Sequence, residues 1–166
     1  MKEDNNKNNS LSIEIIRHSL AHIMALAVKQ LFQEVKFGIG PAIENGFYYD
    51  FDFEKGKSPT PEDLLRIEGK MRGLVKKNIK FEQKSISNIE TNNLFKNQPY
   101  KLELINDLKE GEITIYESGG FIDLCAGPHI KTTAGIDADA FKLTKIAGAY
   151  WRGSEKNPML TRIYGL

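Results

Sequence analysis

The stretch SIEIIRHSLAHIMALAVKQLF, residues 12–32, decides the fold. Its apolar residues recur at intervals of three and four, which is the spacing of one face of an α-helix. The members of this face are Ile13, Ile16, Leu20, Ile23, Ala27 and Leu31. Ser12 is a suitable N-cap, and Glu14 lies in the first turn. The pattern predicts one long, mostly buried helix over residues 11–33.

The ten residues before this helix, MKEDNNKNNS, hold four charges and four asparagines without an apolar run. They have neither the apolar region of a signal peptide nor the pattern of a transit peptide. We expect residues 1–10 to be a disordered tail. Residues 11–166 have the length of a single domain.

Two hairpins and further helices are expected after the long helix. In FGIGPAIENGFYYDFDF, residues 37–53, alternating aromatic residues follow an Asn45-Gly46 turn, which should supply positive φ angles. A second helix should start at Pro61 with Thr60 as its N-cap. Another hairpin should turn at residues 118–120. Helices mixed with antiparallel hairpins predict an α+β fold, with the long helix packed on an antiparallel sheet and a cleft between them.

The composition is that of an ordinary globular protein, with 40% apolar and 27% charged residues. The net charge of +1 gives no general attraction to nucleic acid, so such a partner needs a local basic face. A single cysteine excludes an internal disulfide and fits the reducing cytoplasm, where we expect the protein to work. No apolar segment approaches the length of a membrane span, so no membrane partner is expected.

All three histidines and the only cysteine lie in two motifs of equal spacing, His18-Ser-Leu-Ala-His22 and Cys125-Ala-Gly-Pro-His129. His18 and His22 are one helical turn apart, on a face nearly opposite the aliphatic stripe, so they should not point into the same core. Three imidazoles and a thiol are competent to bind zinc and equally competent to move protons. The plainer alternative is a chance pair on an exposed turn with Cys125 as inert core, which the concentration of every His and Cys disfavours.

Other candidates have a functional and a structural interpretation. Asp123 should share a strand face with Cys125 and could orient a ring or hold an ammonium, or simply face solvent. Lys101 would by pattern alone be a surface lysine, and Tyr49 a core residue. Six basic residues could form a face that contacts phosphate groups, or they could simply be solvated. They are Lys76, Lys77, Lys80, Lys142, Lys145 and Arg152.

Several segments, in order from Ile13 to Tyr164, resemble the editing domain of bacterial-type threonyl-tRNA synthetases. They are HSLAHIMALAVKQLF, FGIGPAIENGFYYDFDF, FIDLCAGPHI, and KIAGAYWRG followed by LTRIYG. The second additional domain of alanyl-tRNA synthetases shares the HxxxH and CxxxH pair, but FYYDFDF and GAYWRG favour the threonyl branch. The resemblance implies hydrolysis of seryl-tRNA wrongly made on the tRNA for threonine, with that tRNA as partner.

The resemblance also implies the site residues. His18 and Lys101 would position and activate water, and Tyr49 and Asp123 would hold the seryl group. His22, Cys125 and His129 would shape and polarise the pocket. Ala126 stands where the family often carries Arg, which removes one possible tRNA contact.

The two branches differ in whether their editing site holds a metal ion. The alanyl branch resembles a zinc site, here His18, His22, Cys125 and His129, whereas the threonyl branch is metal-free. We therefore expect no metal and no cofactor for editing. The alternatives are a zinc-dependent trans-editing aminoacyl-tRNA deacylase and a non-enzymatic zinc-stabilised RNA-binding module. Metal content tests both, and deacylation separates enzyme from module.

The remainder of such a synthetase has no counterpart in the sequence. We expect the chain to be a fragment of a longer enzyme, with a ubiquitin-like N-terminal domain absent or removed. The resemblance implies that ATP is used only in the missing aminoacylation core and that the full-length synthetase is a homodimer.

Overall fold

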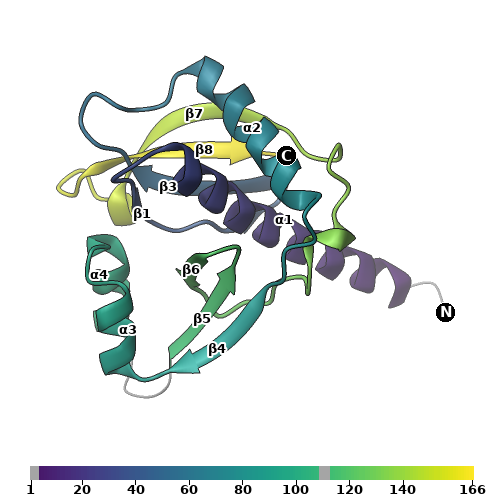
Figure 1. Ribbon diagram of the computed structural model, residues 1–166, viewed down its shortest axis with the longest axis horizontal. Helices are drawn as coiled ribbons and strands as arrows, with labels where there is room; N and C mark the ends of the chain where they lie inside the picture. Colours follow the sequence, from purple (N-terminus) through teal and green to yellow (C-terminus); the bar gives the residue numbers. More distant parts are fainter. Residues whose placement is uncertain (1–3, 109–112) are drawn as a thin grey trace.

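Helix α1 lies between two antiparallel sheets in the computed structural model, which describes residues 4–108 and 113–166 (Figure 1). The helices are α1 (Asp4–Leu31), α2 (Pro61–Val75), α3 (Asn88–Leu94) and α4 (Pro99–Asp107). The strands are β1 (Lys36–Phe37), β2 (Ala42–Ile43), β3 (Gly46–Asp52), β4 (Glu82–Ile86), β5 (Ile113–Ser118), β6 (Phe121–Leu124), β7 (Leu143–Tyr150) and β8 (Met159–Gly165). The predicted α+β class is confirmed, with two sheets where one was expected.

Helix α1 is buried on all sides between Leu20 and Val28. It packs on β3 of the larger sheet, on α2, and on β6 of the smaller sheet. The face that carries His18 and His22 therefore turns toward the smaller sheet rather than toward solvent. The sequence predicted only that this face does not share the core of the aliphatic stripe, and it did not predict the second layer that buries His22.

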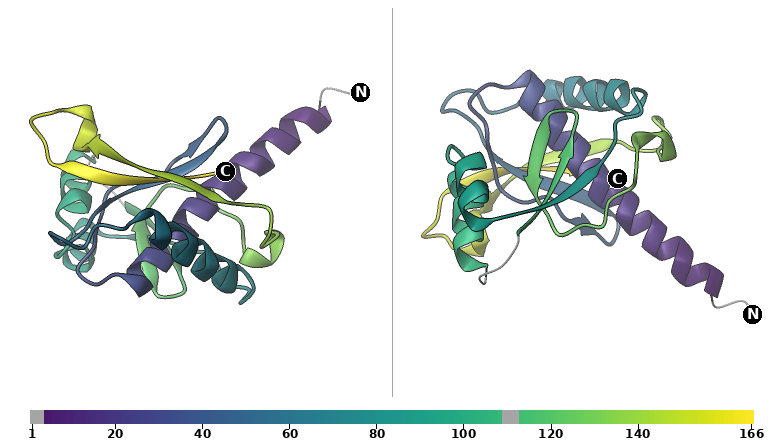
Figure 2. Two further views of the ribbon diagram at one scale, coloured as in Figure 1. Left: turned by 90° about the horizontal axis from the view of Figure 1, so that it is seen from above. Right: turned by 60° about the horizontal axis from the view of Figure 1, so that its bottom comes forward.

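The helix begins at Asp4, eight residues before the expected cap at Ser12. Residues 4–10 are therefore helical rather than part of the disordered tail that we expected, and residues 1–3 lie outside the described residues. No proline or glycine precedes Gly38, so nothing in the sequence stops the helix from extending outward from its buried half. Its first turns project beyond both sheets (Figure 2).

The larger sheet has the order β1-β3-β8-β7, with β2 also paired to β3. The predicted alternation along β3 is confirmed, because Phe47, Tyr49 and Phe51 are buried beneath α1. The hairpin turn between β2 and β3 differs from the expectation, since neither Asn45 nor Gly46 has a positive φ. Gly46 instead permits a close approach, because a Cβ there would lie 2.0 Å from the Gly165 carbonyl oxygen.

The smaller sheet has the order β4-β5-β6 and carries α3 and α4 on the chain segment between β4 and β5. Its β5–β6 hairpin turns at Gly119 and Gly120, both with positive φ. The predicted cap of α2 is confirmed, with the Thr60 amide donating to Asp63 at 2.7 Å. Among the described residues, no helix is long and apolar enough to cross a membrane.

Candidate active site

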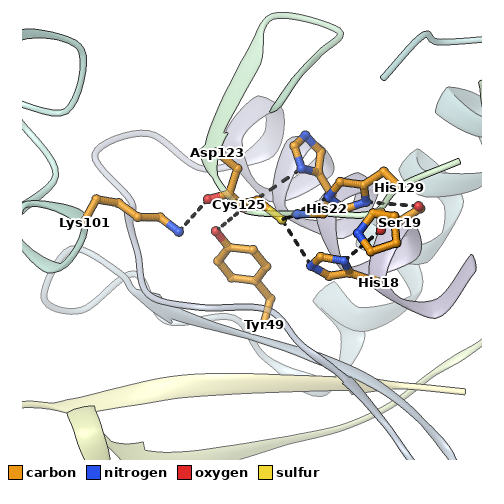
Figure 3. A network of polar contacts seen from close by, with 10 residues as sticks. His18, Ser19, His22, Tyr49, Lys101, Asp123, Cys125 and His129 are labelled. Atoms are coloured by element: carbon orange, nitrogen blue, oxygen red, sulfur yellow. Dashed lines mark hydrogen bonds and ion pairs between the residues drawn. The ribbon is translucent and has the colours of Figure 1, made fainter. Parts of the chain in front are cut away.

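The predicted site residues meet where α1, α4, the segment between β1 and β2, and the end of β6 come together (Figure 3). A cavity of ≈ 200 Å³ lies there, lined by His18, Ile39, Gly40, Pro41, Lys101, Asp123, Leu124 and Cys125. Residues up to 107 positions apart in the sequence thus share one hollow. A second hollow of ≈ 330 Å³ also touches His18 and Pro41, and continues toward Glu14 and Pro128.

Lys101 and Asp123 line one side of the cavity and form a buried polar network with Tyr49. The Lys101 Nζ lies 2.5 Å from Asp123 Oδ1, with the two side chains 3% and 9% exposed. The Tyr49 hydroxyl donates to Asp123 Oδ2 at 2.9 Å. Burial and the nearby carboxylate raise the pKa of Tyr49 well above its usual value, so this phenol stays protonated. Neither Lys101 nor Asp123 is the solvent-facing residue that its local pattern allowed.

His18 and Cys125 line the other side of the cavity, and His129 packs behind them. The Cys125 sulfur lies 3.4 Å from the Nε2 atoms of both His18 and His129, and it accepts the Gly127 amide at 3.2 Å. The two rings stack with centroids 4.2 Å apart. Nδ1 of His18 faces the Pro128 carbonyl oxygen at 3.2 Å, and because a carbonyl oxygen can only accept, this nitrogen carries a proton. Both rings therefore direct Nε2 at the thiol.

His22 lies one helical turn deeper than His18 and is 2% exposed. Its ring packs edge-on against Phe121, Phe81 and His129. Neither ring nitrogen has a hydrogen-bond partner among the described residues, and Nδ1 is 4.0 Å from Asp123. His22 is thus brought near the site but does not line its cavity.

Burial sets the protonation of these groups. It lowers the pKa of His22 to about 4 and that of His129 to about 2, so both rings are neutral at neutral pH. Burial also raises the pKa of the Cys125 thiol to about 11. Because burial outweighs the opposing effect of the Lys101 cation, Cys125 is a protonated thiol rather than a thiolate nucleophile.

Three of the predicted site residues lie close enough together to hold one metal ion. Ligand atoms of His18, Cys125 and His129 all lie within 4.8 Å of one another. His22 is not in this group, so the predicted four-residue zinc set is reduced to three ligands. Three protein ligands with an open position resemble a catalytic rather than a structural zinc site. The residues present therefore fit a zinc ion, and such an ion would supply Lewis acidity toward water at that position.

Sequence reasoning missed Ser19 and Tyr116. Ser19 is fully buried, and its hydroxyl lies 3.0 Å from Nδ1 of His129. The Tyr116 ring packs edge-on against His129 with centroids 4.5 Å apart. Ser19 lies inside the HxxxH motif, and its position beside His18 was the available signal. Arg152 forms an ion pair with Asp107, so one member of the suggested basic face already has an acidic partner.

Comparison with known proteins shows what the chain is similar to. Residues 113–164 match the family model described as the threonyl and alanyl tRNA synthetase second additional domain. The resemblance to the editing domain of threonyl-tRNA synthetases is thereby confirmed, and the matched segment contains Asp123, Cys125 and His129.

Similar curated proteins are named threonine–tRNA ligase. One from Dehalococcoides mccartyi is 57% identical over 153 residues, which is 92% of this chain and 26% of the relative. One from Thermotoga maritima is 54% identical over 92% of this chain and 24% of the relative. One from Borreliella burgdorferi is 54% identical over 90% of this chain and 26% of the relative. The chain thus spans about a quarter of the length of the curated relatives it matches.

Proposed function

We propose that the chain is a post-transfer editing domain that hydrolyses the ester of serine wrongly attached to the tRNA for threonine. The observation that carries this proposal is the cavity that joins the buried Lys101–Asp123 pair to His18 and Cys125. The similarity to threonine–tRNA ligases supports tRNA as the partner. The activity proposed for the domain is aminoacyl-tRNA deacylation.

The chemical need for such a site follows from the size of the two amino acids. Serine is threonine without one methyl group, and a missing methylene in a binding pocket discriminates by only about 1–3 kcal/mol. A second site that admits serine and excludes threonine by steric clash removes the error. Ile39, Gly40 and Pro41 line the cavity, and the buried Tyr49 ring packs behind Gly40, which suits this segment to such exclusion.

In the proposed mechanism, Asp123 and Tyr49 bind the seryl group. The Asp123 carboxylate has lone pairs beyond those used by Lys101 and Tyr49, and these can accept the substrate ammonium. Lys101 holds the ester carbonyl or the water and stabilises the oxyanion that develops. Because the side chain of Lys101 is 3% exposed, its charge acts in a site from which water is largely excluded.

His18 is the proposed general base. Its Nδ1 proton is held by the Pro128 carbonyl, so the Nε2 lone pair is directed at the cavity. It takes a proton from the attacking water and returns it to the leaving ribose hydroxyl. Cys125 and His129 orient this nitrogen, and His22 supports His129 from behind.

A zinc-dependent aminoacyl-tRNA deacylase is the second candidate, and the three clustered ligands favour it. His18, Cys125 and His129 would hold the ion. This candidate differs from the metal-free one in a measurable way, since chelation would abolish activity and zinc would restore it. A zinc-stabilised RNA-binding module would instead bind metal without deacylating any substrate.

The testing experiment is incubation of the purified chain with seryl-tRNA and threonyl-tRNA for threonine, with and without chelator. The proposal expects faster loss of serine than of threonine and no effect of the chelator. Equal rates for both substrates contradict selective editing. Loss of activity with chelator, restored by zinc, replaces the metal-free mechanism with the zinc-dependent one.

For the full-length protein we propose the aminoacylation reaction named in its relatives, with ATP used outside this domain. A homodimeric full-length synthetase and a cytoplasmic location are part of the same proposal.

A further inference from the structure

The Ser19 hydroxyl makes three polar contacts between α1 and the loop that follows β6. It lies 2.8 Å from the Ile15 carbonyl oxygen and 3.1 Å from the Ile130 amide nitrogen. It also lies 3.0 Å from His129 Nδ1 (Figure 3). A hydroxyl has one proton to donate and two lone pairs. The Ile15 carbonyl can only accept, and the Ile130 amide can only donate.

The distances indicate which atom donates in the contacts of Ser19 with Ile15 and with His129. An O–H···O bond is typically 2.7–2.8 Å long and an N–H···O bond about 2.9–3.0 Å long. The 2.8 Å contact fits donation by Ser19 to Ile15, and the 3.0 Å contact fits donation by His129 Nδ1 to Ser19. In a neutral imidazole one ring nitrogen carries the proton and the other a lone pair, so a proton on Nδ1 leaves the lone pair on Nε2, which faces the Cys125 sulfur at 3.4 Å.

The tautomer of His129 decides where the thiol proton of Cys125 goes. The sulfur is 3.4 Å from Nε2 of His129 and 3.4 Å from Nε2 of His18, and it has a single proton. If His129 offers a lone pair, the thiol donates to it and Nε2 of His18 stays free for water. If His129 carries its proton on Nε2, it donates to the sulfur, and the thiol then occupies His18.

We infer that Ser19 is a positioning residue that fixes the Nδ1–H tautomer of His129, draws the Cys125 thiol proton to His129, and thereby leaves His18 free to act as the base. The catalytic part of this inference rests on the proposed function. The tautomer itself does not, because it is a property of the free protein.

The direct test is long-range ¹H–¹⁵N NMR of the ¹⁵N-histidine-labelled chain at neutral pH. The chain has only three histidines, so single-histidine variants assign the signals. We expect His129 to carry its proton on Nδ1 in the wild type and to lose that preference in Ser19→Ala. Ser19→Thr retains the hydroxyl and should retain the tautomer. An Nε2–H tautomer in the wild type, or an unchanged one in Ser19→Ala, overturns the inference.

The kinetic test is single-turnover deacylation of seryl-tRNA. Removing an outer partner of an active-site histidine typically costs 10–100-fold, and Ser19→Ala should lower kcat by this order with little change in KM. In a Cys125→Ala background the competing thiol proton is gone. Adding Ser19→Ala to this background should therefore lower kcat by less than about twofold. A full additional loss in that background shows a merely structural role and overturns the inference.

Thr91→Ala is the matched control. Thr91 is also fully buried in a helix and donates its hydroxyl to a carbonyl four residues earlier, that of Ser87, at 2.7 Å. It lies in α3, away from the histidines, so its removal should leave both tautomer and kcat unchanged. A wild type that shows the expected tautomer but cannot hydrolyse seryl-tRNA contradicts the proposed function and leaves the tautomer assignment standing.

Discussion

Lys101 is a buried lysine whose only ion-pair partner among the described residues is Asp123. Removing one member of a buried pair leaves an uncompensated charge, which costs about 3–5 kcal/mol. Lys101→Met should therefore lower the free energy of unfolding by this order and also abolish deacylation, because the oxyanion loses its cation. Chemical denaturation and single-turnover kinetics measure the two effects.

A matched control for Lys101 is Lys84, which pairs with Glu117 on the surface at 2.7 Å. An exposed pair contributes at most about 1 kcal/mol, so Lys84→Met should change stability little and activity not at all. Equal losses in both variants would contradict a special role for the buried pair.

Replacing Cys125 tests whether its thiol takes part in the deacylation chemistry. Burial raises its pKa to about 11, so at neutral pH it stays protonated and should not attack the ester. We expect Cys125→Ala to lower the deacylation rate by less than about tenfold, well below the cost of losing a general base. Nearly complete loss would assign Cys125 as a nucleophile or a metal ligand.

The local sequence patterns predicted where helices begin and which faces they bury, but they did not predict the contacts between elements. The stripe of Ile23 and Ala27 identified α1, and Thr60 with Asp63 identified the start of α2. Lys101 shows the limit. On α4 it has the pattern of a surface lysine, and only the approach of β6 with Asp123 buries it. Likewise, Ser19 has only its place inside the HxxxH motif as a signal, and its role depends on Ile130 and His129, which lie against it in the fold.

In the segment between β1 and β2, Gly40 packs directly against the Tyr49 ring. A Cβ at Gly40 would lie 2.1 Å from the Tyr49 ring, which is buried and stacked on Phe51. Gly40→Ala must push this ring and with it the hydroxyl that holds Asp123. We expect a loss of about 1–3 kcal/mol from overpacking, together with a lower deacylation rate.

Gly69→Ala on α2 is the comparison for Gly40. A Cβ at Gly69 would meet nothing within 4 Å, and the residue lies inside a helix. Alanine there should raise stability by roughly 0.5–1 kcal/mol and leave activity unchanged. Thermal melting of both variants checks the pair, and a Gly40→Ala protein as stable and active as the wild type would contradict the packing argument.

For the whole molecule, the two-sheet arrangement around α1 determines stability as a function of pH. His22 has a folded pKa of about 4, below the unfolded value of 6.5. The unfolded chain therefore binds a proton in this range that the folded chain does not, so stability falls as pH drops from 6.5 to 4. This histidine alone should cost about 3 kcal/mol across that window.

Denaturant unfolding of the wild type and of His22→Leu, at pH 7 and at pH 4.5, measures this term. The variant should lose less stability than the wild type on acidification, because it lacks the histidine that takes up a proton only when the chain unfolds. Parallel losses in the two proteins would show that His22 is not buried in its neutral form. The sequence placed His22 on the correct helix face but could not reveal the second sheet that buries it.

We propose that the cavity hydrolyses seryl-tRNA with His18 as the base. The most direct test is single-turnover deacylation of seryl-tRNA by the wild type, by His18→Ala and by His22→Leu, the matched control within the same motif. Thermal melting checks that each variant is folded. General-base catalysis contributes about 10²–10⁴-fold. We expect His18→Ala to lose activity in that range while remaining folded, and His22→Leu to lose far less. A folded His18→Ala protein that deacylates at nearly the wild-type rate would contradict the account.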